Sequence, residues 1–293
     1  MTDFFDTPVD LTLLGGPVRL YRGGEVGPPV VLLHGAMFDT GRGVWHDVAP
    51  VLAERYRVHV VDLPRHGGSR PWRGMLDQDF FLRFVDALLD SLELPRAALV
   101  GLSMGGGVAA GYAVARPERV TALVAIGPGG LDAVRPYQFL TWLLSRTPGL
   151  LQLTSLWLAR SPGSVRASLA GHLVAGERTP GFDRIVDIVT EEAQAKWRHR
   201  EKAMDDWQIA ACGPRVMRLH LTPTLGQVTA PILWLRGDRD PLVSEEVLAA
   251  AHAATPGSRL VAIPEAGHVA SYDQPELVSS LIRDFLDETL AAE

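Results

Sequence analysis

A serine between two glycines is the first feature of this sequence that could do chemistry. Ser103 stands in the pentapeptide GLSMG (residues 101–105), which fits the pattern G-x-S-x-G. An apolar run precedes it and an alanine-rich helical pattern follows, which is the strand-to-helix context that this pattern requires. Small neighbours let strand and helix approach, and the strained turn raises the hydroxyl at the carboxyl end of the sheet. We expect Ser103 to be a nucleophile; the alternative is a helix-capping serine in a glycine-rich turn.

A serine hydroxyl is a poor nucleophile without a base, and partners occur later in the chain. His268 lies in the glycine-flanked loop "PEAGHVA", and Asp238 and Asp240 lie in "LRGDRDPLV". The order serine, aspartate, histidine is the one that accompanies this serine turn. Asp240 lies further into its loop, whereas Asp238 directly follows a glycine, in a position that suits a turn cap. We therefore expect the triad Ser103, Asp240 and His268.

Acyl transfer also needs donors for the oxyanion. The first should be the backbone N–H of Met104, directly after the serine. The second should come from the loop in "LLHGAMFDTG", where the N–H of Ala36 is the first candidate and that of Met37 the second. We expect His34 to fix this loop by hydrogen bonds rather than to move protons.

The elements that must position these residues alternate between two patterns. Short runs that are apolar on both faces predict strands at 29–35, 56–64, 96–103, 120–128, 230–238 and 258–267. Helical patterns occupy 45–56, 79–93, 104–118, 245–257 and 275–292. This alternation predicts a doubly wound, mostly parallel α/β sheet. Residues 9–24 alternate in polarity around a Gly-Gly pair, which predicts an antiparallel hairpin at the sheet edge.

The strand-helix alternation stops between residues 131 and 220. This segment is helical in pattern and contains several tryptophans, among them Trp142 and Trp157. We expect a helical insertion at 131–220 and a core made of 1–130 and 221–293. The tryptophans suggest an apolar, aromatic or medium-chain acyl substrate; the alternative is that they pack the helices against one another.

Composition excludes several classes of partner. The net charge is −6 without a basic block, which argues against nucleic acid or an anionic membrane. The most apolar stretch, 139–158, contains Arg146 and Pro148, so we expect pocket-lining or buried helices rather than a membrane span, with a membrane-contacting lid as the lesser alternative. No metal cluster or phosphate loop is apparent, so we expect no cofactor. The sequence does not set the oligomeric state.

Cysteine usage and the first residues bear on the compartment. With Cys212 alone, no internal disulfide is possible, which fits a reducing compartment. The first ten residues are acidic and lack the pattern of a signal peptide. We expect a cytoplasmic protein.

Five segments in order give the chain a family resemblance: "LLHGA", "VVDLPRHGGS", "VGLSMGG", "LRGDRDPLV" and "IPEAGH". Together they resemble the α/β-hydrolase superfamily, in its branch with a helical cap. The resemblance implies an eight-stranded sheet, a cap at 131–220, the triad Ser103, Asp240 and His268, and oxyanion donors at Ala36 and Met104. One departure is Arg65, where many relatives carry glycine, which predicts an altered loop near the cap.

The resemblance also separates branches of the superfamily. Dehalogenase-like and epoxide-hydrolase-like members carry aspartate where Ser103 stands. Carbon–carbon bond hydrolases usually have a longer glycine-rich stretch than "HGAMFDTG", and the GGG-type loop of many lipases is absent. We expect a serine hydrolase of a small, largely apolar ester. The alternatives are a carbon–carbon bond hydrolase, perhydrolase or lyase on the same triad, and a ligand-binding member that does not hydrolyse.

Overall fold

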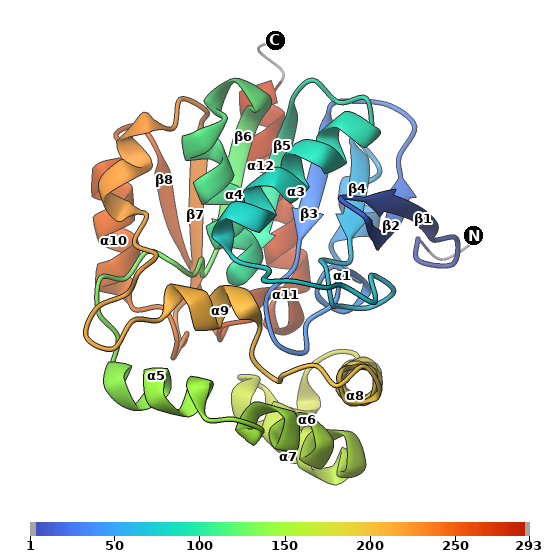
Figure 1. The fold of residues 1–293 in the computed structure, drawn as a ribbon. Coiled ribbons are helices and arrows are strands. Elements are labelled where there is room, and N and C mark those ends of the chain that lie inside the picture. Colours follow the sequence, from blue (N-terminus) through green and yellow to red (C-terminus); the bar gives the residue numbers. More distant parts are fainter. Residues whose placement is uncertain (1–3, 291–293) are drawn as a thin grey trace.

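An eight-stranded sheet forms the centre of the molecule in the computed structural model, which describes residues 4–290 (Figure 1). The strands are β1 (Val9–Leu13), β2 (Gly16–Gly23), β3 (Pro29–Leu33), β4 (Arg57–Val61), β5 (Ala97–Leu102), β6 (Val120–Ile126), β7 (Ile232–Gly237) and β8 (Arg259–Ile263). Their order is β1-β2-β4-β3-β5-β6-β7-β8. The β1–β2 hairpin is antiparallel and lies at the edge, β2 pairs antiparallel with β4, and the remaining neighbours are parallel. The predicted fold class and edge hairpin are confirmed.

Helices cover both faces of the sheet, which explains why its central parallel strands are apolar on both sides. One face packs against α3 (Gln78–Ser91), α4 (Met104–Ala115) and α10 (Glu245–Ala254). The other packs against α1 (Gly41–Val44), α2 (Ala49–Leu52) and α12 (Pro275–Leu290), with the short α11 (Ala270–Asp273) just before α12. Consecutive residues of β3 serve opposite layers: Leu33 packs with the first set of helices and Leu32 with the second.

The helix predicted at 45–56 is wrong as a continuous element. Helix α1 ends at Val44, Trp45 leaves helical geometry with φ −106° and ψ 9°, and within 45–56 only α2 is helical. Pro50 lies in the first turn of α2, where its missing N–H removes no helical hydrogen bond but would interrupt a longer helix. The proline therefore starts a new helix rather than continuing the old one.

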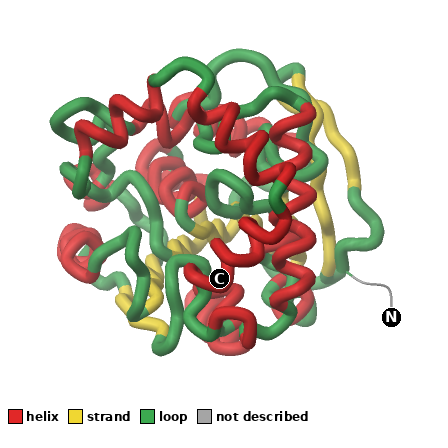
Figure 2. Tube along the Cα trace, turned by 90° about the horizontal axis from the view of Figure 1, so that it is seen from below, coloured by secondary structure: helices red, strands yellow, loops and turns green. Residues whose placement is uncertain are grey.

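Five helices lie between β6 and β7, beyond the carboxyl ends of the parallel strands (Figures 1 and 2). They are α5 (Gln138–Arg146), α6 (Leu150–Arg160), α7 (Pro162–His172), α8 (Phe182–Arg198) and α9 (Asp206–Ala211). The helical character of this segment agrees with the sequence pattern, while the division into a core and a cap stays a prediction. Among residues 4–290, no helix has both the length and the apolar character to cross a membrane.

Candidate active site

Ser103 occupies a strained turn between β5 and α4. Its φ is 51° and its ψ is −113°, a conformation that residues other than glycine rarely adopt. A Cβ on Gly101 would lie 2.4 Å from the carbonyl carbon of Gly105, and a Cβ on Gly105 would lie 2.3 Å from the Leu33 oxygen. The two glycines of the pattern are therefore required by the close crossing of strand and helix.

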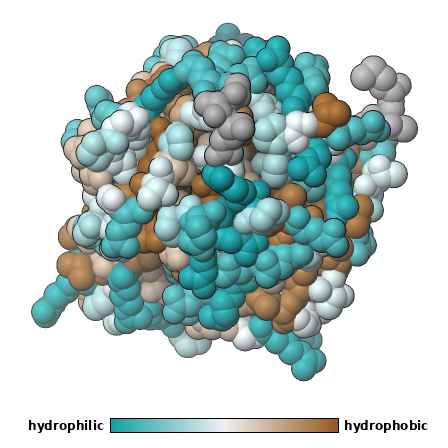
Figure 3. Space-filling view, turned by 90° about the horizontal axis from the view of Figure 1, so that it is seen from above, coloured by the Kyte–Doolittle hydropathy of each residue, from teal (hydrophilic) through white to brown (hydrophobic). Residues whose placement is uncertain are grey.

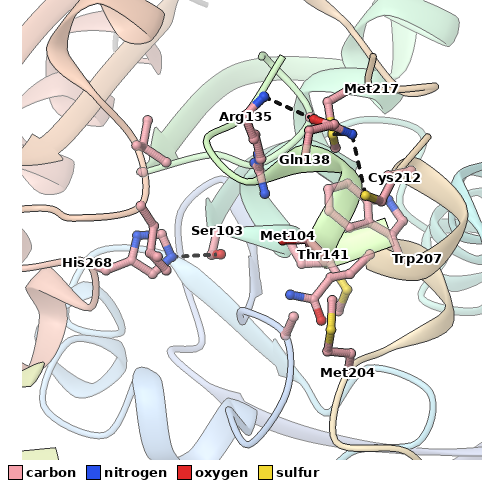
Figure 4. Close-up of a pocket in the computed structure, with 18 of the residues that line it drawn as sticks. Ser103, Met104, Arg135, Gln138, Thr141, Met204, Trp207, Cys212, Met217 and His268 are labelled. Carbon is pink, nitrogen blue, oxygen red and sulfur yellow. Dashed lines mark hydrogen bonds between the residues drawn. The ribbon is translucent and has the colours of Figure 1, made fainter. Parts of the chain in front are cut away.

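The side chains of Ser103, His268 and Asp240 meet at the carboxyl end of the sheet, and Figure 4 shows the contact between Ser103 and His268. Ser103 Oγ lies 2.9 Å from His268 Nε2, and His268 Nδ1 lies 2.9 Å from Asp240 Oδ2. An ionised carboxylate can only accept, so Nδ1 carries the proton and Nε2 accepts from the serine hydroxyl. Ser103 makes no side-chain capping bond to α4, which argues against the capping alternative. Asp238 instead accepts from Ala266 N at 3.2 Å and so holds the neighbouring loop.

The environment of Asp240 keeps its carboxylate charged. Burial acts to raise its pKa, but the His268 ring and the backbone N–H groups of Leu242 and Val243 outweigh burial, so the pKa lies below its usual value. Those N–H groups donate to Oδ1 at 2.7 and 3.1 Å. A Cβ on Gly127 would lie 2.9 Å from Asp240 Oδ2, so a glycine allows the pair to approach β6.

The two residues expected to supply oxyanion donors line the same cavity as the serine. Ala36 and Met104 both line it, and in the described part of the chain neither N–H is bonded to a protein acceptor. The N–H of Met37, the second candidate, is already engaged by Asp205 Oδ2 at 2.6 Å. Met104 also begins α4, where the positive end of the helix dipole adds to the field at the serine.

His34 fixes the loop that carries Ala36. Its Nδ1 donates to the Gly35 carbonyl at 2.7 Å, and its Nε2 accepts from Leu63 N at 2.9 Å. Its backbone oxygen accepts from Gly105 N at 3.1 Å, which ties this loop to the serine turn. Burial, followed by the neighbouring His66, lowers the pKa of His34 well below its usual range, so the ring is neutral. The hydrogen bonds expected of His34 are therefore confirmed.

The cavity above Ser103 holds about 200 Å³ and mixes apolar with polar side chains. Residues that sequence reasoning did not identify line it: Arg135, Gln138, Thr141, Met204, Trp207 and Met217. Trp142 and Trp157, from which an apolar substrate was expected, do not line it, and Trp157 is 56% exposed. No local pattern distinguishes Trp207 from these two, because only the path of the chain decides which ring faces the serine.

Arg135 is the one Lys, Arg, Asp or Glu side chain among the described residues that line this cavity. Its Nε donates to Asp132 Oδ2 at 2.6 Å, and its backbone N–H donates to Gln138 Oε1 at 3.0 Å. The guanidinium extends from this anchored base toward the side of the cavity where Ser103 lies (Figure 4). Its terminal nitrogens, Nη1 and Nη2, make no hydrogen bond to the described residues.

Buried ion pairs connect the loop after β4 to the helical segment. Arg65, the departure noted in the sequence, has a left-handed φ of 68° and contacts Asp206 through Nη1 at 2.5 Å. Arg70 is almost fully buried and pairs with Glu192 and, at 2.9 Å, with Glu201. The expectation that Arg65 bears on the loop near the helical segment agrees with this contact.

Asp205 joins this network to the loop of Ala36. Its Oδ1 accepts from Lys196 Nζ at 2.9 Å, and its Oδ2 accepts from Met37 N and lies 3.3 Å from His66 Nε2. The side chains of Lys196 and His66 are each only 1% exposed. Burial acts to raise the pKa of Asp205, but Lys196 and His66 outweigh it and hold the pKa far below its usual value.

The described residues contain no group of three or more His, Cys, Asp or Glu side chains arranged to hold a metal ion. The expectation that the protein works without a cofactor stays a prediction. Cys212 is buried and unpaired.

Comparison with known proteins places this geometry in context. Residues 28–275 match the family described as alpha/beta hydrolase fold. The chain is 27% identical to a 2-hydroxy-6-oxo-6-phenylhexa-2,4-dienoate hydrolase of Burkholderia cepacia, over 92% of this chain and 91% of that one. It is 26% identical to a pimeloyl-[acyl-carrier protein] methyl ester esterase of Aeromonas hydrophila, over 92% and 99%. A solved esterase from Thermogutta terrifontis has the same fold, with a TM-score of 0.76, 23% identity and coverage of 97% and 99%.

Proposed function

This chain belongs to the α/β hydrolase fold family, and from that premise we propose that it is a serine hydrolase that cleaves an ester of a small, largely apolar substrate. The observation that carries the proposal is the chain of contacts from Ser103 Oγ through His268 to Asp240, at 2.9 Å for each link. A relative named as a methyl ester esterase supports an ester as the bond that is cleaved. The volume of about 200 Å³ supports a small acyl or alcohol group next to the serine.

The proposed reaction proceeds by acyl transfer to water. His268 Nε2 takes the proton from Ser103 as Oγ attacks the ester carbonyl, and Asp240 stabilises the imidazolium that forms. The N–H groups of Ala36 and Met104 stabilise the tetrahedral oxyanion. His268 then gives its proton to the departing alcohol and later activates the water that releases the acid.

The proposal is tested by removing the Ser103 hydroxyl and measuring the loss of ester hydrolysis. Ser103→Ala should lower kcat/KM for p-nitrophenyl butyrate by about 10⁴-fold or more, and should abolish labelling by a fluorophosphonate. Ser168→Ala, an exposed serine on α7, is the matched control and should retain full activity and labelling. Unchanged ester hydrolysis in a correctly folded Ser103→Ala protein would disprove the assignment. Absence of turnover by the wild type across a broad ester panel would favour a ligand-binding protein.

A second candidate is cleavage of a carbon–carbon bond on the same three residues. The 27% identical relative named as a dienoate hydrolase favours it. Turnover of a 2-hydroxy-6-oxo-dienoate, followed by loss of its visible absorbance, should exceed ester turnover in kcat/KM if this candidate is correct. Ester turnover that exceeds dienoate turnover supports the first proposal. The division into a core and a cap at 131–220 is proposed on the same family premise.

A further inference from the structure

Helix α5 has the reverse of the usual amphipathic arrangement, and the neighbouring α6 also exposes large apolar side chains. A surface helix normally buries its apolar side chains and exposes its polar ones. In α5 the buried residues are Gln138 and Ser145, while the exposed ones are Phe139 (60%), Leu140 (50%), Leu143 (47%) and Leu144 (44%). In α6 the buried residues are Leu151 and Ser155, while Leu153 (61%) and Trp157 (56%) are exposed. Large apolar side chains gathered on one surface mark a site of contact rather than a solvated face.

The charge of this segment is also one-sided. Residues 133–176 contain four arginines and no Asp or Glu, in a chain whose net charge is −6. Two of the four are paired with acids outside this range, Arg135 with Asp132 and Arg166 with Glu177 and Asp183, whereas Arg160 is not paired with any described acid. Arg160 at the end of α6 is exposed, and Arg215 and Arg218 are exposed beside a groove that Phe139 and Trp142 also line. Within residues 4–290, none of these three arginines has an acidic partner. The protein therefore has a local basic and apolar surface although its net charge is negative.

These helices form an outer layer of the molecule. In Figure 1 α5 and α6 lie at the bottom, with α9 between α5 and the sheet. The opposite side of the protein, seen in Figure 3, exposes mainly hydrophilic side chains. The inner side of α5 contributes Gln138 and Thr141 to the cavity of Ser103, so this helix separates that cavity from the outer surface.

We propose that the α5–α6 surface docks onto an anionic phospholipid bilayer. Leucine, phenylalanine and tryptophan side chains enter the boundary between headgroups and acyl chains, and the arginines contact the phosphates. A second copy of this chain fits less well, because a two-fold interface opposes the same patch to itself and would bring arginines together without acidic partners. Docking in this orientation brings the cavity of Ser103 next to the lipid surface. The proposal does not depend on which bond the protein cleaves.

Cosedimentation of the full chain with vesicles tests the proposal. Binding should be stronger for vesicles of phosphatidylcholine with one quarter phosphatidylglycerol than for phosphatidylcholine alone, and it should weaken at high salt. Leu143→Gln combined with Trp157→Gln should weaken binding by about tenfold or more. Arg160→Gln combined with Arg215→Gln should weaken binding to the anionic vesicles by about fivefold for each charge removed.

Matched variants on other surfaces distinguish docking through α5 and α6 from non-specific adsorption to vesicles. Val26→Gln removes an apolar side chain that is 68% exposed between β2 and β3, and Arg22→Gln removes an exposed charge on β2. Both should bind vesicles like the wild type. Equal binding to neutral and anionic vesicles, or no binding, would overturn the proposal. So would a stable dimer in light scattering that Leu143→Gln with Trp157→Gln converts to monomer, because the surface would then be covered by a second copy. Circular dichroism checks that every variant is folded.

Discussion

Replacing the carboxylate of Asp205 by an amide changes few atoms, but it should lower the free energy of unfolding of the protein substantially. Asp205→Asn keeps the shape of the side chain and an oxygen that can accept from Met37 N, but it leaves the ammonium of Lys196 without its anion. That side chain is 1% exposed and its nitrogen lies 2.9 Å from Asp205 Oδ1. Breaking a buried ion pair from one side costs about 3–5 kcal/mol of unfolding free energy, because the remaining charge is uncompensated.

Adding a second substitution, at Lys196, shows whether the loss of stability comes from the uncompensated ammonium or from the lost hydrogen bond. Asp205→Asn with Lys196→Met removes both charges, and an apolar side chain of similar length then fills the buried space. Replacing both members of a buried pair is often neutral or stabilising. We therefore expect the double variant to be more stable than Asp205→Asn alone, with a coupling energy of about 1–3 kcal/mol.

Urea unfolding followed by circular dichroism and tryptophan fluorescence measures these free energies. The exposed pair of Arg259 and Glu288 provides the control, since Arg259→Met should cause no measurable loss. The reasoning is refuted if Asp205→Asn loses less than about 1 kcal/mol, or if the losses measured for Asp205→Asn and for Lys196→Met alone simply add in the double variant.

Three further predictions concern the site. Asp240→Asn should lower kcat for the ester by about 10⁴-fold at neutral pH, because the imidazole adopts the wrong tautomer, and equal rates would contradict the role given to Asp240. Arg135→Met should raise KM for an ester that bears a carboxylate, such as monomethyl glutarate, by about tenfold, because it removes a charge-assisted hydrogen bond, with methyl butyrate as the neutral control. Asp39 lies in the loop after β3, where burial raises the pKa of its carboxyl to about 6, above its ordinary 3.8. The folded state holds this proton more tightly, so the contribution of Asp39 to stability should be lost as the pH rises from about 4 to about 6. In urea unfolding at a series of pH values, the stability of the wild type relative to Asp39→Asn should fall over this range, and a difference that stays constant with pH would contradict the prediction.

The fold was predictable because its signals are local. Runs apolar on both faces mark strands that are covered from both sides, and β3, β5 and β6 are buried along nearly all their length. The serine turn was equally visible, since the glycines that its geometry requires are adjacent in sequence. The prediction of one helix at 45–56 was wrong because Pro50 lies in the first turn of a new helix, α2. Hydrophobic periodicity alone does not show whether a helix continues up to such a proline or begins at it.

The choice between the two aspartates illustrates the limit of local reasoning. Position in the loop favoured Asp240 over Asp238, and in the structure Asp240 contacts His268 while Asp238 holds the backbone at Ala266. Both residues lie in the same loop, so only the approach of the histidine loop, 28 positions later, separates their environments. The two candidates for the second oxyanion donor, Ala36 and Met37, also differ only in the tertiary structure. The N–H of Met37 donates to Asp205, which lies 168 positions away in the sequence.

By itself the sequence determined the sheet, the serine turn and the order of the candidate triad, because each depends on residues that are neighbours along the chain. Tertiary structure decided that Trp207 and Arg135, rather than Trp142 and Trp157, face the serine. It also decided that Lys196 is buried against Asp205 and that the apolar side of α5 faces outward. These properties depend on how a helical segment packs over the sheet, and hydrophobic periodicity gives a helix its two faces without fixing which one meets the protein.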